Sequence, residues 1–252
     1  MYGTLPDDAW LRILPLLQKH PLVRVNAHTR CFLDAVHWIL RTGSQWRALP
    51  AHLGNWNSIY RRFRRWSARG IFQDIFDEFS RNADYEWLLI DSTTVRAHMS
   101  AAGAPKTSGG QQAQSFGRGR GGFSTKVHIK TDALGLPLEL ALTPGNRGDM
   151  IGVWMVLEPE DSCAQAVMAD SAYDAGALRE HIEEIGALAV IPRNPTRSVH
   201  IEHDQDLYRA RHVVECFINK IKWFRRVATR FDKLDVVFLA FLQLASIMVW
   251  LR

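Results

Sequence analysis

The stretch Glu86-Trp-Leu-Leu-Ile-Asp91 is a run of mostly apolar residues that ends on a carboxylate. The same pattern recurs in Ala166-Val-Met-Ala-Asp170, again an apolar run followed by an aspartate. Continuous apolar runs of this length are typical of strands that are buried on both faces of a sheet. The sequence therefore predicts two interior strands, and each strand ends by presenting an aspartate.

The residues around these two strands indicate an α/β fold. Apolar and polar residues alternate through 123–130, a turn follows at 132–135, and leucines alternate through 136–142, which is the pattern of a β-hairpin. Residues 188–191 predict a further strand. Helices are expected in three more segments, at 151–157, 175–185 and 236–251. This order of elements predicts a mixed sheet with helices on its faces.

A third acidic residue lies in the stretch Tyr208–Arg226, which reads YRARHVVECFINKIKWFRR. At about 100° per residue, a single helix through this stretch would place four polar side chains within an arc of roughly 60°: Tyr208, Arg211, Glu215 and Lys222. Glu215 would then stand among two cations and a phenol, a set that suits both metal and phosphate chemistry. An ordinary surface ion pair between Arg211 and Glu215, four residues apart, is the alternative.

The three acids Asp91, Asp170 and Glu215 need a counter-charge if the fold brings them together. Buried carboxylates without a partner repel one another and raise their own pKa values. A divalent cation removes this repulsion, and two magnesium ions about 4 Å apart can activate an attacking oxygen and stabilise a leaving one. For any single aspartate, a helix N-cap or a loop salt bridge is the competing interpretation. Asp149, in a Gly-rich loop after a strand, is a further candidate to line the same site.

Residues 5–81 are predicted to be all-helical and to include one strongly basic helix, Ser58–Ala68, capped by Asn55 or Asn57. Four arginines lie outside the apolar stripe of this helix: Arg61, Arg62, Arg64 and Arg65. Short helices that include a basic one resemble a helix-turn-helix, in which arginines contact phosphates and guanine edges of DNA. A solvated basic face on a small helical bundle is the alternative.

The segment 100–122 is rich in glycine and carries the cations Lys106, Arg118 and Arg120. This composition predicts a flexible basic loop that could order on a phosphate backbone, with simple disorder as the alternative for its first half. The net charge of +5 over 252 residues is compatible with a nucleic-acid partner.

Three widely spaced cysteines without a C-x-x-C pair argue against a disulfide framework or a structural zinc site, and they fit a reducing cytoplasm. The first residues do not have the basic-then-apolar pattern of a signal peptide. The apolar run 236–251 contains Gln243 and Ser246 and is short for a bilayer, so we expect a buried helix, with a membrane span as the alternative.

With these residues identified, the chain resembles a bacterial insertion-sequence transposase of the Asp-Asp-Glu (DDE) type, and more narrowly insertion-sequence family five, in the ribonuclease H and retroviral integrase superfamily. The resemblance covers nearly the whole chain. It rests on LLIDSTTVRAH (88–98), on GGFSTKVHIKTDALGLPLELALTPG (121–145), on VMADSAYDA (167–175), and on the spacing of Tyr208, Arg211, Glu215 and Lys222.

The resemblance implies a ribonuclease H-like catalytic domain over 83–252 that follows a helical DNA-binding domain over 1–82. It also implies that Asp91, Asp170 and Glu215 bind Mg²⁺ or Mn²⁺, with two ions expected. Such an enzyme would bind the terminal inverted repeats of an insertion sequence, hydrolyse a strand at each end to free a 3′-hydroxyl, and join that hydroxyl to target DNA.

By the same resemblance, Arg211 and Lys222 would hold phosphates at the transposon end, and Tyr208 would position the strand. The partner is double-stranded DNA, both the terminal repeats and the target. A homodimer or a larger synaptic complex is expected because two ends must be joined, and the expected location is the bacterial cytoplasm, in association with the nucleoid. Two alternatives remain: another ribonuclease H-like DNA nuclease that cleaves without joining, and a sequence-specific DNA-binding regulator with an inactive core.

Overall fold

The computed structural model describes residues 3–119, 121–157, 161, 163–196 and 201–252. The chain forms two compact units, and each of them is discontinuous in sequence. The first unit combines Met1–Arg81, Arg96–Gln114 and Lys220–Arg252, and the second combines Asn82–Val95 with Ser115–Asn219. These units do not follow the linear order of the chain. The expected division into domains 1–82 and 83–252 stays a prediction.

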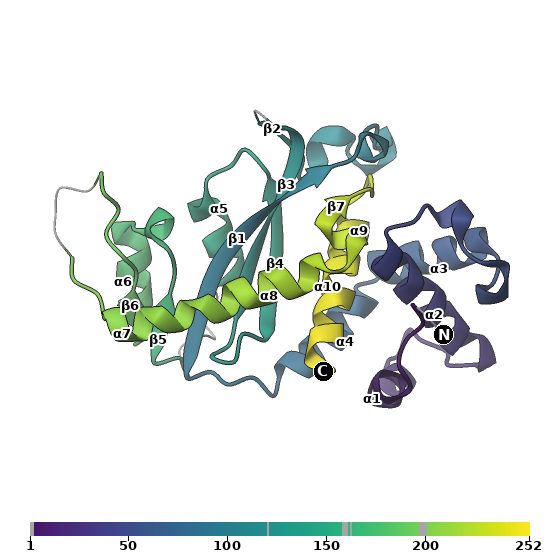
Figure 1. Cartoon of the computed structure of the whole chain (residues 1–252), viewed down its shortest axis with the longest axis horizontal. Helices are drawn as coiled ribbons and strands as arrows, with labels where there is room; N and C mark the ends of the chain where they lie inside the picture. The colour runs from purple at the N-terminus through teal and green to yellow at the C-terminus, as the bar shows by residue number, and fades with distance from the viewer. Residues whose placement is uncertain (1–2, 120, 158–160, 162, 197–200) are drawn as a thin grey trace. The chain divides into compact units, whose positions relative to one another are not determined.

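In the described part of the chain the strands form a seven-stranded sheet of order β2-β3-β1-β5-β6, in which β4 also pairs with β3 and β7 with β1 (Figure 1). The strands are β1 (Trp87–Ala97), β2 (Gly117–Gly119), β3 (Gly122–Thr131), β4 (Pro137–Pro144), β5 (Ala166–Met168), β6 (Leu188–Val190) and β7 (Thr229–Arg230). β5 runs parallel to β1 and to β6, whereas β3 runs antiparallel to β2 and β4. The predicted mixed sheet of an α/β fold is therefore confirmed.

Strand β1 is longer than the sequence pattern predicted. It does not end at Asp91 but continues to Ala97, so Asp91 lies in the middle of the strand and not at its end. The continuation is stabilised in two ways: Val95 is buried, and Arg96 and Ala97 pair with the short strand β7. Because β7 comes from a distant part of the sequence, local periodicity could not reveal this partner.

The predicted hairpin is present as β3 and β4, with register pairs from Thr125↔Pro144 to Thr131↔Pro137. Helix α5 (Asp149–Val156) packs on these two strands, and α6 (Gly176–Glu184) packs on β6. The packing of α5 is close at Gly152, where an added Cβ would overlap the buried His128 ring on β3. These contacts fix the position of Asp149, the first residue of α5.

The stretch Tyr208–Arg226 is not one continuous helix, as was expected. It is divided into α7 (Gln205–Tyr208), a 3₁₀ turn (Arg209–Arg211), α8 (His212–Lys222) and α9 (Arg225–Ala228). At the second interruption Phe224 has an extended backbone and a ring that is 1% exposed, so burial of this ring accompanies the break. The predicted arc of roughly 60° for the four polar side chains therefore does not hold as a property of a single helix.

The first unit contains the helical N-terminal region, as predicted. Its helices are α1 (Asp7–Lys19), α2 (Ala27–Thr42), α3 (Trp56–Ala68), α4 (Ile71–Ser80), α9 and α10 (Asp235–Trp250). Asn55 caps α3, because its side-chain oxygen accepts hydrogen bonds from the N–H groups of Asn57 and Ser58.

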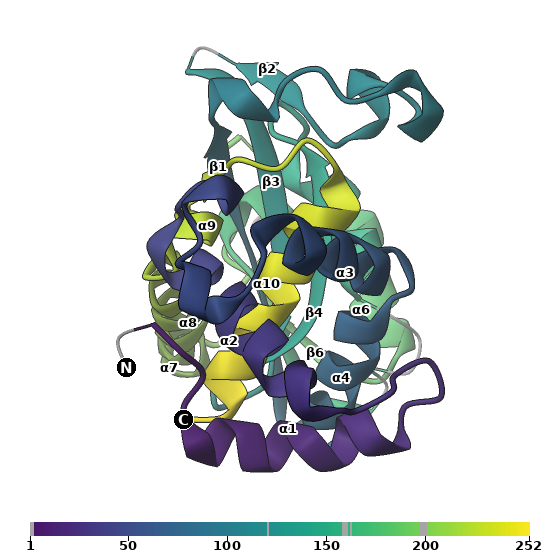
Figure 2. The same ribbon diagram turned by 90° about the vertical axis from the view of Figure 1, so that its right-hand side faces the viewer.

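Helix α10 lies among α2, α3 and α4 in the first unit (Figure 2), and the Phe241 ring on α10 is 4.5 Å from that of Phe63 on α3. The predicted buried helix at 236–251 is thus confirmed. No helix among the described residues has the length and apolar character that crossing a membrane requires. The segment 100–122, expected to be a loop, contains 3₁₀ turns and the short strand β2.

Candidate active site

Asp91 and Asp170 are brought side by side by the register of two parallel strands. Leu89 on β1 pairs with Met168 on β5, and each aspartate follows two residues later. Asp91 is 9% exposed and Asp170 is half-buried. Their proximity also appears in the electrostatics, because the charge of Asp170 contributes to a raised pKa at Asp91.

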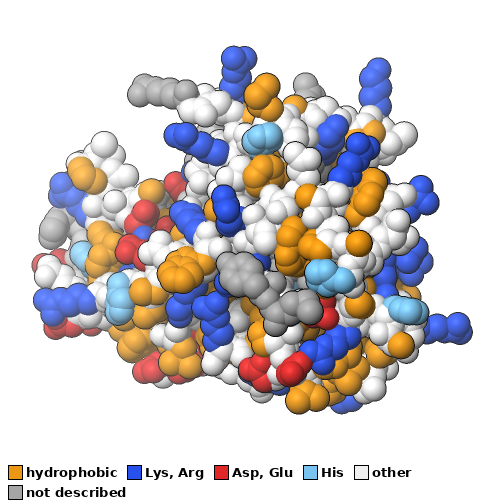
Figure 3. All heavy atoms as spheres, turned by 45° about the vertical axis from the view of Figure 1, so that its right-hand side comes forward, with side chains coloured by type: hydrophobic (Ala, Val, Ile, Leu, Met, Phe, Trp, Pro, Cys, Tyr) orange, Lys and Arg blue, Asp and Glu red, His pale blue; other side chains and the backbone are white. Residues whose placement is uncertain are grey.

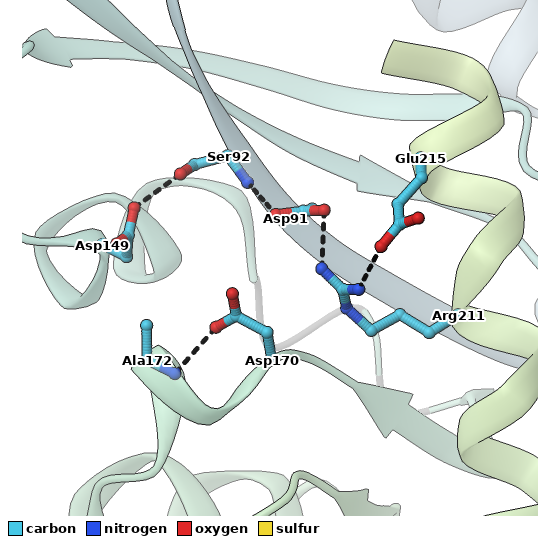
Figure 4. A network of polar contacts seen from close by, with 7 residues as sticks. All are labelled: Asp91, Ser92, Asp149, Asp170, Ala172, Arg211 and Glu215. Atoms are coloured by element: carbon cyan, nitrogen blue, oxygen red, sulfur yellow. Dashed lines mark hydrogen bonds and ion pairs between the residues drawn. The ribbon is translucent and has the colours of Figure 1, made fainter. Parts of the chain in front are cut away.

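Glu215 is linked to Asp91 through a single guanidinium group. The Nη2 atom of Arg211 donates to Oδ2 of Asp91 at 2.8 Å, and its Nη1 atom donates to Oε1 of Glu215 at 2.6 Å (Figure 4). Arg211 lies on the 3₁₀ turn that precedes α8, and Glu215 lies in the first turn of α8 itself. The Arg211–Glu215 ion pair that was the alternative interpretation is therefore present, and the guanidinium extends it to Asp91 on the sheet.

The pKa values reflect this shared cation. Burial raises the pKa of the Asp91 carboxyl above its ordinary value, although Arg211 and the Ser92 N–H oppose the shift. Burial alone would lower the pKa of Arg211, but the charge of Asp91 and the hydrogen bond to Glu215 outweigh it, and that pKa is raised. The guanidinium therefore stays charged and is the counter-charge for two of the three acids, Asp91 and Glu215.

Asp170 has a further partner of its own. Its Oδ1 atom accepts a hydrogen bond of 2.8 Å from the Ala172 N–H at the start of a 3₁₀ turn (Ser171–Tyr173) (Figure 4). The capping interpretation of this aspartate is thus also present in the structure. Within the described ranges no three His, Cys, Asp or Glu side chains lie close enough together to hold a metal ion. In this arrangement the acids are held by Arg211 and by backbone N–H groups.

Next to Asp91 lies a second group of polar residues, Ser92, Lys126 and Asp149, and the sequence pattern identified only Asp149 among them. Ser92 donates from its Oγ to Oδ1 of Asp149 at 2.5 Å, and Lys126 on β3 donates from Nζ to the same oxygen at 2.8 Å. Ser92 also donates its backbone N–H to Oδ1 of Asp91 at 2.7 Å, so one residue contacts both carboxylates (Figure 4). Period-two alternation on β1 could have signalled Ser92, because neighbouring side chains on a strand point to opposite faces.

Burial and hydrogen bonding shift the pKa of the Asp149 carboxyl in opposite directions. It would raise the pKa of this carboxyl, but the hydrogen bonds from Lys126 and Ser92 outweigh it and lower the pKa below 3.8. Tyr173, whose side chain is 1% exposed, faces the same group of acids, and burial raises the pKa of its phenol. Asp149 is therefore an ionised, fixed residue behind the candidate site.

The remaining residues of the helix motif differ in their surroundings. Tyr208 is half-buried, its ring lies 5.4 Å from the ring of His203, and burial raises the pKa of its phenol. Lys222 is exposed at the end of α8, seven residues beyond Glu215. Lys222 belongs to the first compact unit, whereas Tyr208, Arg211 and Glu215 belong to the second.

The basic residues expected to contact DNA fall into two groups. Arg61, Arg64 and Arg65 on α3 are exposed, and so is Arg118 on β2; Arg120 lies outside the described residues. Arg62 differs, because its guanidinium stacks at 4.4 Å from the Phe32 ring centroid and 5.0 Å from that of Trp66. It also donates to Oγ1 of Thr29 at 3.2 Å, so Arg62 has a structural role inside the first unit.

Comparison with known proteins identifies the family. Residues 5–76 match the family described as "Putative transposase of IS4/5 family", and residues 82–250 match the family described as "Transposase DDE domain". A "Putative transposase for insertion sequence element IS6501" from Brucella ovis is 44% identical over 131 residues, which are 52% of this chain and 100% of that protein. "Uncharacterized protein y4sN" from Sinorhizobium fredii is 40% identical over 114 residues, 44% of this chain and 91% of that protein.

Among solved structures, the "Mos1 mariner paired end complex with Mn" aligns with 98% of this chain and 86% of that chain, at 12% identity and a TM-score of 0.28. The family assignment rests on the two sequence families that match residues 5–76 and 82–250. The DDE family model spans more than half of the chain, including both strands with their aspartates and the helix with Glu215. The predicted resemblance and the mixed α/β architecture are confirmed, and the chain belongs to the family of DDE transposases.

Proposed function

We propose that this transposase binds the terminal inverted repeats of its insertion sequence, hydrolyses one strand at each end, and joins the freed 3′-hydroxyl groups to target DNA. Asp91, Asp170 and Glu215 would form the catalytic acid set and would hold Mg²⁺ or Mn²⁺, with two ions expected. Two observations support the proposal: Asp91 on β1 and Glu215 on α8 meet at the Arg211 guanidinium, and Asp170 follows β5, the strand that pairs with β1.

The chemistry of the donors fits a hard divalent cation. All three side chains supply carboxylate oxygens, which are the ligands that Mg²⁺ and Mn²⁺ prefer. The cluster already binds one positive group, the Arg211 guanidinium, so it can stabilise positive charge at this place. When bound, the ions would supply Lewis-acid activation of the attacking oxygen and stabilisation of the leaving oxygen.

The residues of the chain itself would orient the reacting groups. Asp91 is fixed by the Ser92 N–H within a strand, and Asp170 is fixed by the Ala172 N–H, so both carboxylates are held before DNA arrives. Preorganised charge of this kind is effective because it needs little rearrangement during the reaction. Arg211 and Lys222 would contact phosphates at the transposon end, and Tyr208 would position the strand. A covalent Tyr208 intermediate is not needed for metal-dependent hydrolysis.

Several exposed cations would bind the duplex. Arg61, Arg64 and Arg65 on α3 are exposed, as is Arg118 on β2, and Figure 3 shows Lys and Arg side chains at many places on the surface that it draws. We further propose a helical DNA-binding domain over 1–82 and a catalytic domain over 83–252. Because two transposon ends must be joined, the working form would be a homodimer or larger assembly on DNA, located in the bacterial cytoplasm and nucleoid.

The test is cleavage and joining of duplex DNA that carries the terminal repeats of the element, with Mg²⁺ or Mn²⁺. Wild-type protein is compared with Asp91→Asn, Glu215→Gln and the matched control Glu180→Gln, an exposed glutamate on α6. We expect Asp91→Asn and Glu215→Gln to bind the repeats without cleaving them, and Glu180→Gln to retain activity.

Two other results would replace the proposal. Cleavage by wild-type protein without joining of any 3′ end to new DNA would indicate a nuclease. Binding of the repeats by every variant, with no cleavage by wild type, would indicate a DNA-binding regulator. For the interaction with the duplex, Arg61→Glu and Arg64→Glu should weaken binding and lower the salt slope by about 0.9 for each phosphate that the protein no longer neutralises.

A further inference from the structure

We propose that Arg211 is an internal counter-ion that closes the acidic site of the free protein and must release Glu215 before a divalent ion can bind. This inference rests on the proposed function, because it takes Asp91, Asp170 and Glu215 as the metal ligands. It goes beyond that function by making metal loading depend on where one guanidinium lies. Arg211 would hold Glu215 in the absence of metal, and in the presence of metal it would contact a DNA phosphate in place of Glu215.

The first argument is that Arg211 uses the oxygens that a metal ion would need. Its two terminal nitrogens contact Oδ2 of Asp91 and Oε1 of Glu215 (Figure 4). A Mg²⁺ ion requires its oxygen ligands at about 2.0–2.1 Å in a near-octahedral arrangement. A guanidinium held against the same oxygens fills that space and repels a second cation there.

The second argument concerns which of the two contacts can open. The side chains of Arg211 and Asp91 are each 13% exposed, whereas the Glu215 side chain is 55% exposed. An exposed ion pair between residues four apart contributes little to stability, and a buried one is costly to break. The Arg211–Glu215 contact is therefore the one that opens, and Glu215 becomes free to take a metal ion together with Asp91.

The third argument is that the closed arrangement leaves Arg211 incompletely paired. Its Nε atom is buried and makes no hydrogen bond with any described residue. A buried donor without a partner is unfavourable, so another arrangement can compete with this one. A phosphate offers two oxygens that can accept hydrogen bonds from both arms of the planar guanidinium fork. DNA would thus draw Arg211 away from Glu215, and the metal ion would repel it in the same direction.

These two effects form one coupled equilibrium. If DNA favours the open position of Arg211, and the divalent ion also favours it, each ligand must raise the affinity for the other by the same factor. The free protein would then bind divalent ions weakly and would gain affinity when the transposon end is bound. Such coupling would keep the acidic site unloaded in protein that is not on its DNA.

The test measures Mn²⁺ affinity of the full chain by electron paramagnetic resonance of the free ion, without DNA. We expect Arg211→Gln to bind Mn²⁺ about five-fold or more tightly than wild type, in the range of typical coupling between sites. Arg211→Lys, which keeps the charge but loses the fork, should lie between the two. The control Arg209→Gln removes an exposed arginine of the same turn, which pairs with Asp206, and should leave the affinity unchanged.

A second measurement keeps the test decisive if Arg211→Gln folds poorly, because wild-type protein alone is used. A terminal-repeat duplex should tighten Mn²⁺ binding by wild type, and Mn²⁺ should tighten duplex binding by the same factor. Equal or weaker Mn²⁺ binding by Arg211→Gln, together with loss of binding in Asp91→Asn, would overturn the role of Arg211 while leaving the metal site intact. Binding that Asp91→Asn does not change, or no binding by wild type even on DNA, would overturn the metal site itself.

Discussion

Replacement of Asp149 by alanine should destabilise the fold behind the acidic site while leaving the three candidate metal ligands in place. Oδ1 of Asp149 accepts hydrogen bonds from Ser92 Oγ and from Lys126 Nζ, and the side chains of Lys126 and Asp149 are 12% and 24% exposed. Asp149→Ala removes the acceptor from both donors at once. The ammonium of Lys126 would remain largely buried beside an apolar methyl group.

The expected loss follows from these two hydrogen bonds. A hydrogen bond to a charged group contributes about 1.5–3 kcal/mol, and the pair with Lys126 lies between an exposed one, worth about 0–1 kcal/mol, and a buried one. Relief of the desolvation of Asp149 itself offsets part of this sum. We therefore expect Asp149→Ala to lower the free energy of unfolding by about 2–4 kcal/mol at neutral pH. Asp149→Asn, which keeps an acceptor for Ser92, should lose less.

The pH dependence of this loss has a defined sign. The folded-state pKa of Asp149 is lowered below 3.8, its unfolded value. A lowered pKa stabilises the folded protein above the unfolded pKa, and this contribution disappears as the pH falls through the folded pKa. The difference between wild type and Asp149→Ala should therefore be the same at pH 7 and pH 5, and should shrink only below about pH 4.

The assay is urea unfolding followed by circular dichroism, for wild type, Asp149→Ala, Lys126→Met and the double variant. The double variant should lose less than the sum of the single losses, with a coupling of about 1–2 kcal/mol, because both changes break the same ion pair. A loss below about 0.5 kcal/mol for Asp149→Ala, or a difference that grows as the pH falls, would refute the reasoning.

Three further variants test the packing around the sheet and in the first unit. Lys130→Met should lower the free energy of unfolding by about 3–5 kcal/mol, because it removes the ammonium that the buried Asp161 carboxylate contacts at 2.8 Å. The double variant Lys130→Met with Asp161→Leu should recover much of this loss in urea unfolding. Gly152→Ala should cost about 1–3 kcal/mol in the same assay, because its methyl group overlaps the His128 ring. In the control Gly119→Ala the added methyl group meets no atom of the described residues within 4 Å, so the unfolding free energy should change little. Arg62→Ala should lower the unfolding free energy by about 1–2 kcal/mol, because the stacking on Phe32 and Trp66 is removed. The control Arg61→Ala changes an exposed residue and should alter the unfolding free energy by no more than about 0.5 kcal/mol. Equal effects of the two variants would contradict the structural role of Arg62.

The local sequence pattern was sufficient to predict most of the helices and strands. The hairpin β3–β4, the strand β5 that precedes Asp170 and the buried helix α10 were each predicted from periodicity within a few residues of their bounds. The strand with Asp91 was predicted at its start, but it continues beyond Asp91 to Ala97. Side-chain period and turn chemistry are properties of neighbouring residues, so a single sequence displays them directly. The helix cap at Asn55 was predicted in the same way.

The sequence by itself determined the α/β class, the helical N-terminal region and the acids available to the site. The tertiary structure decided how far β1 continues, where the stretch after Tyr208 is interrupted, and which groups neutralise the acids. Arg211 and Asp91 are 120 positions apart in the chain, and no local pattern specifies their contact. Such contacts depend on the register of distant strands and on the burial of residues such as Phe224, which only the packed molecule defines.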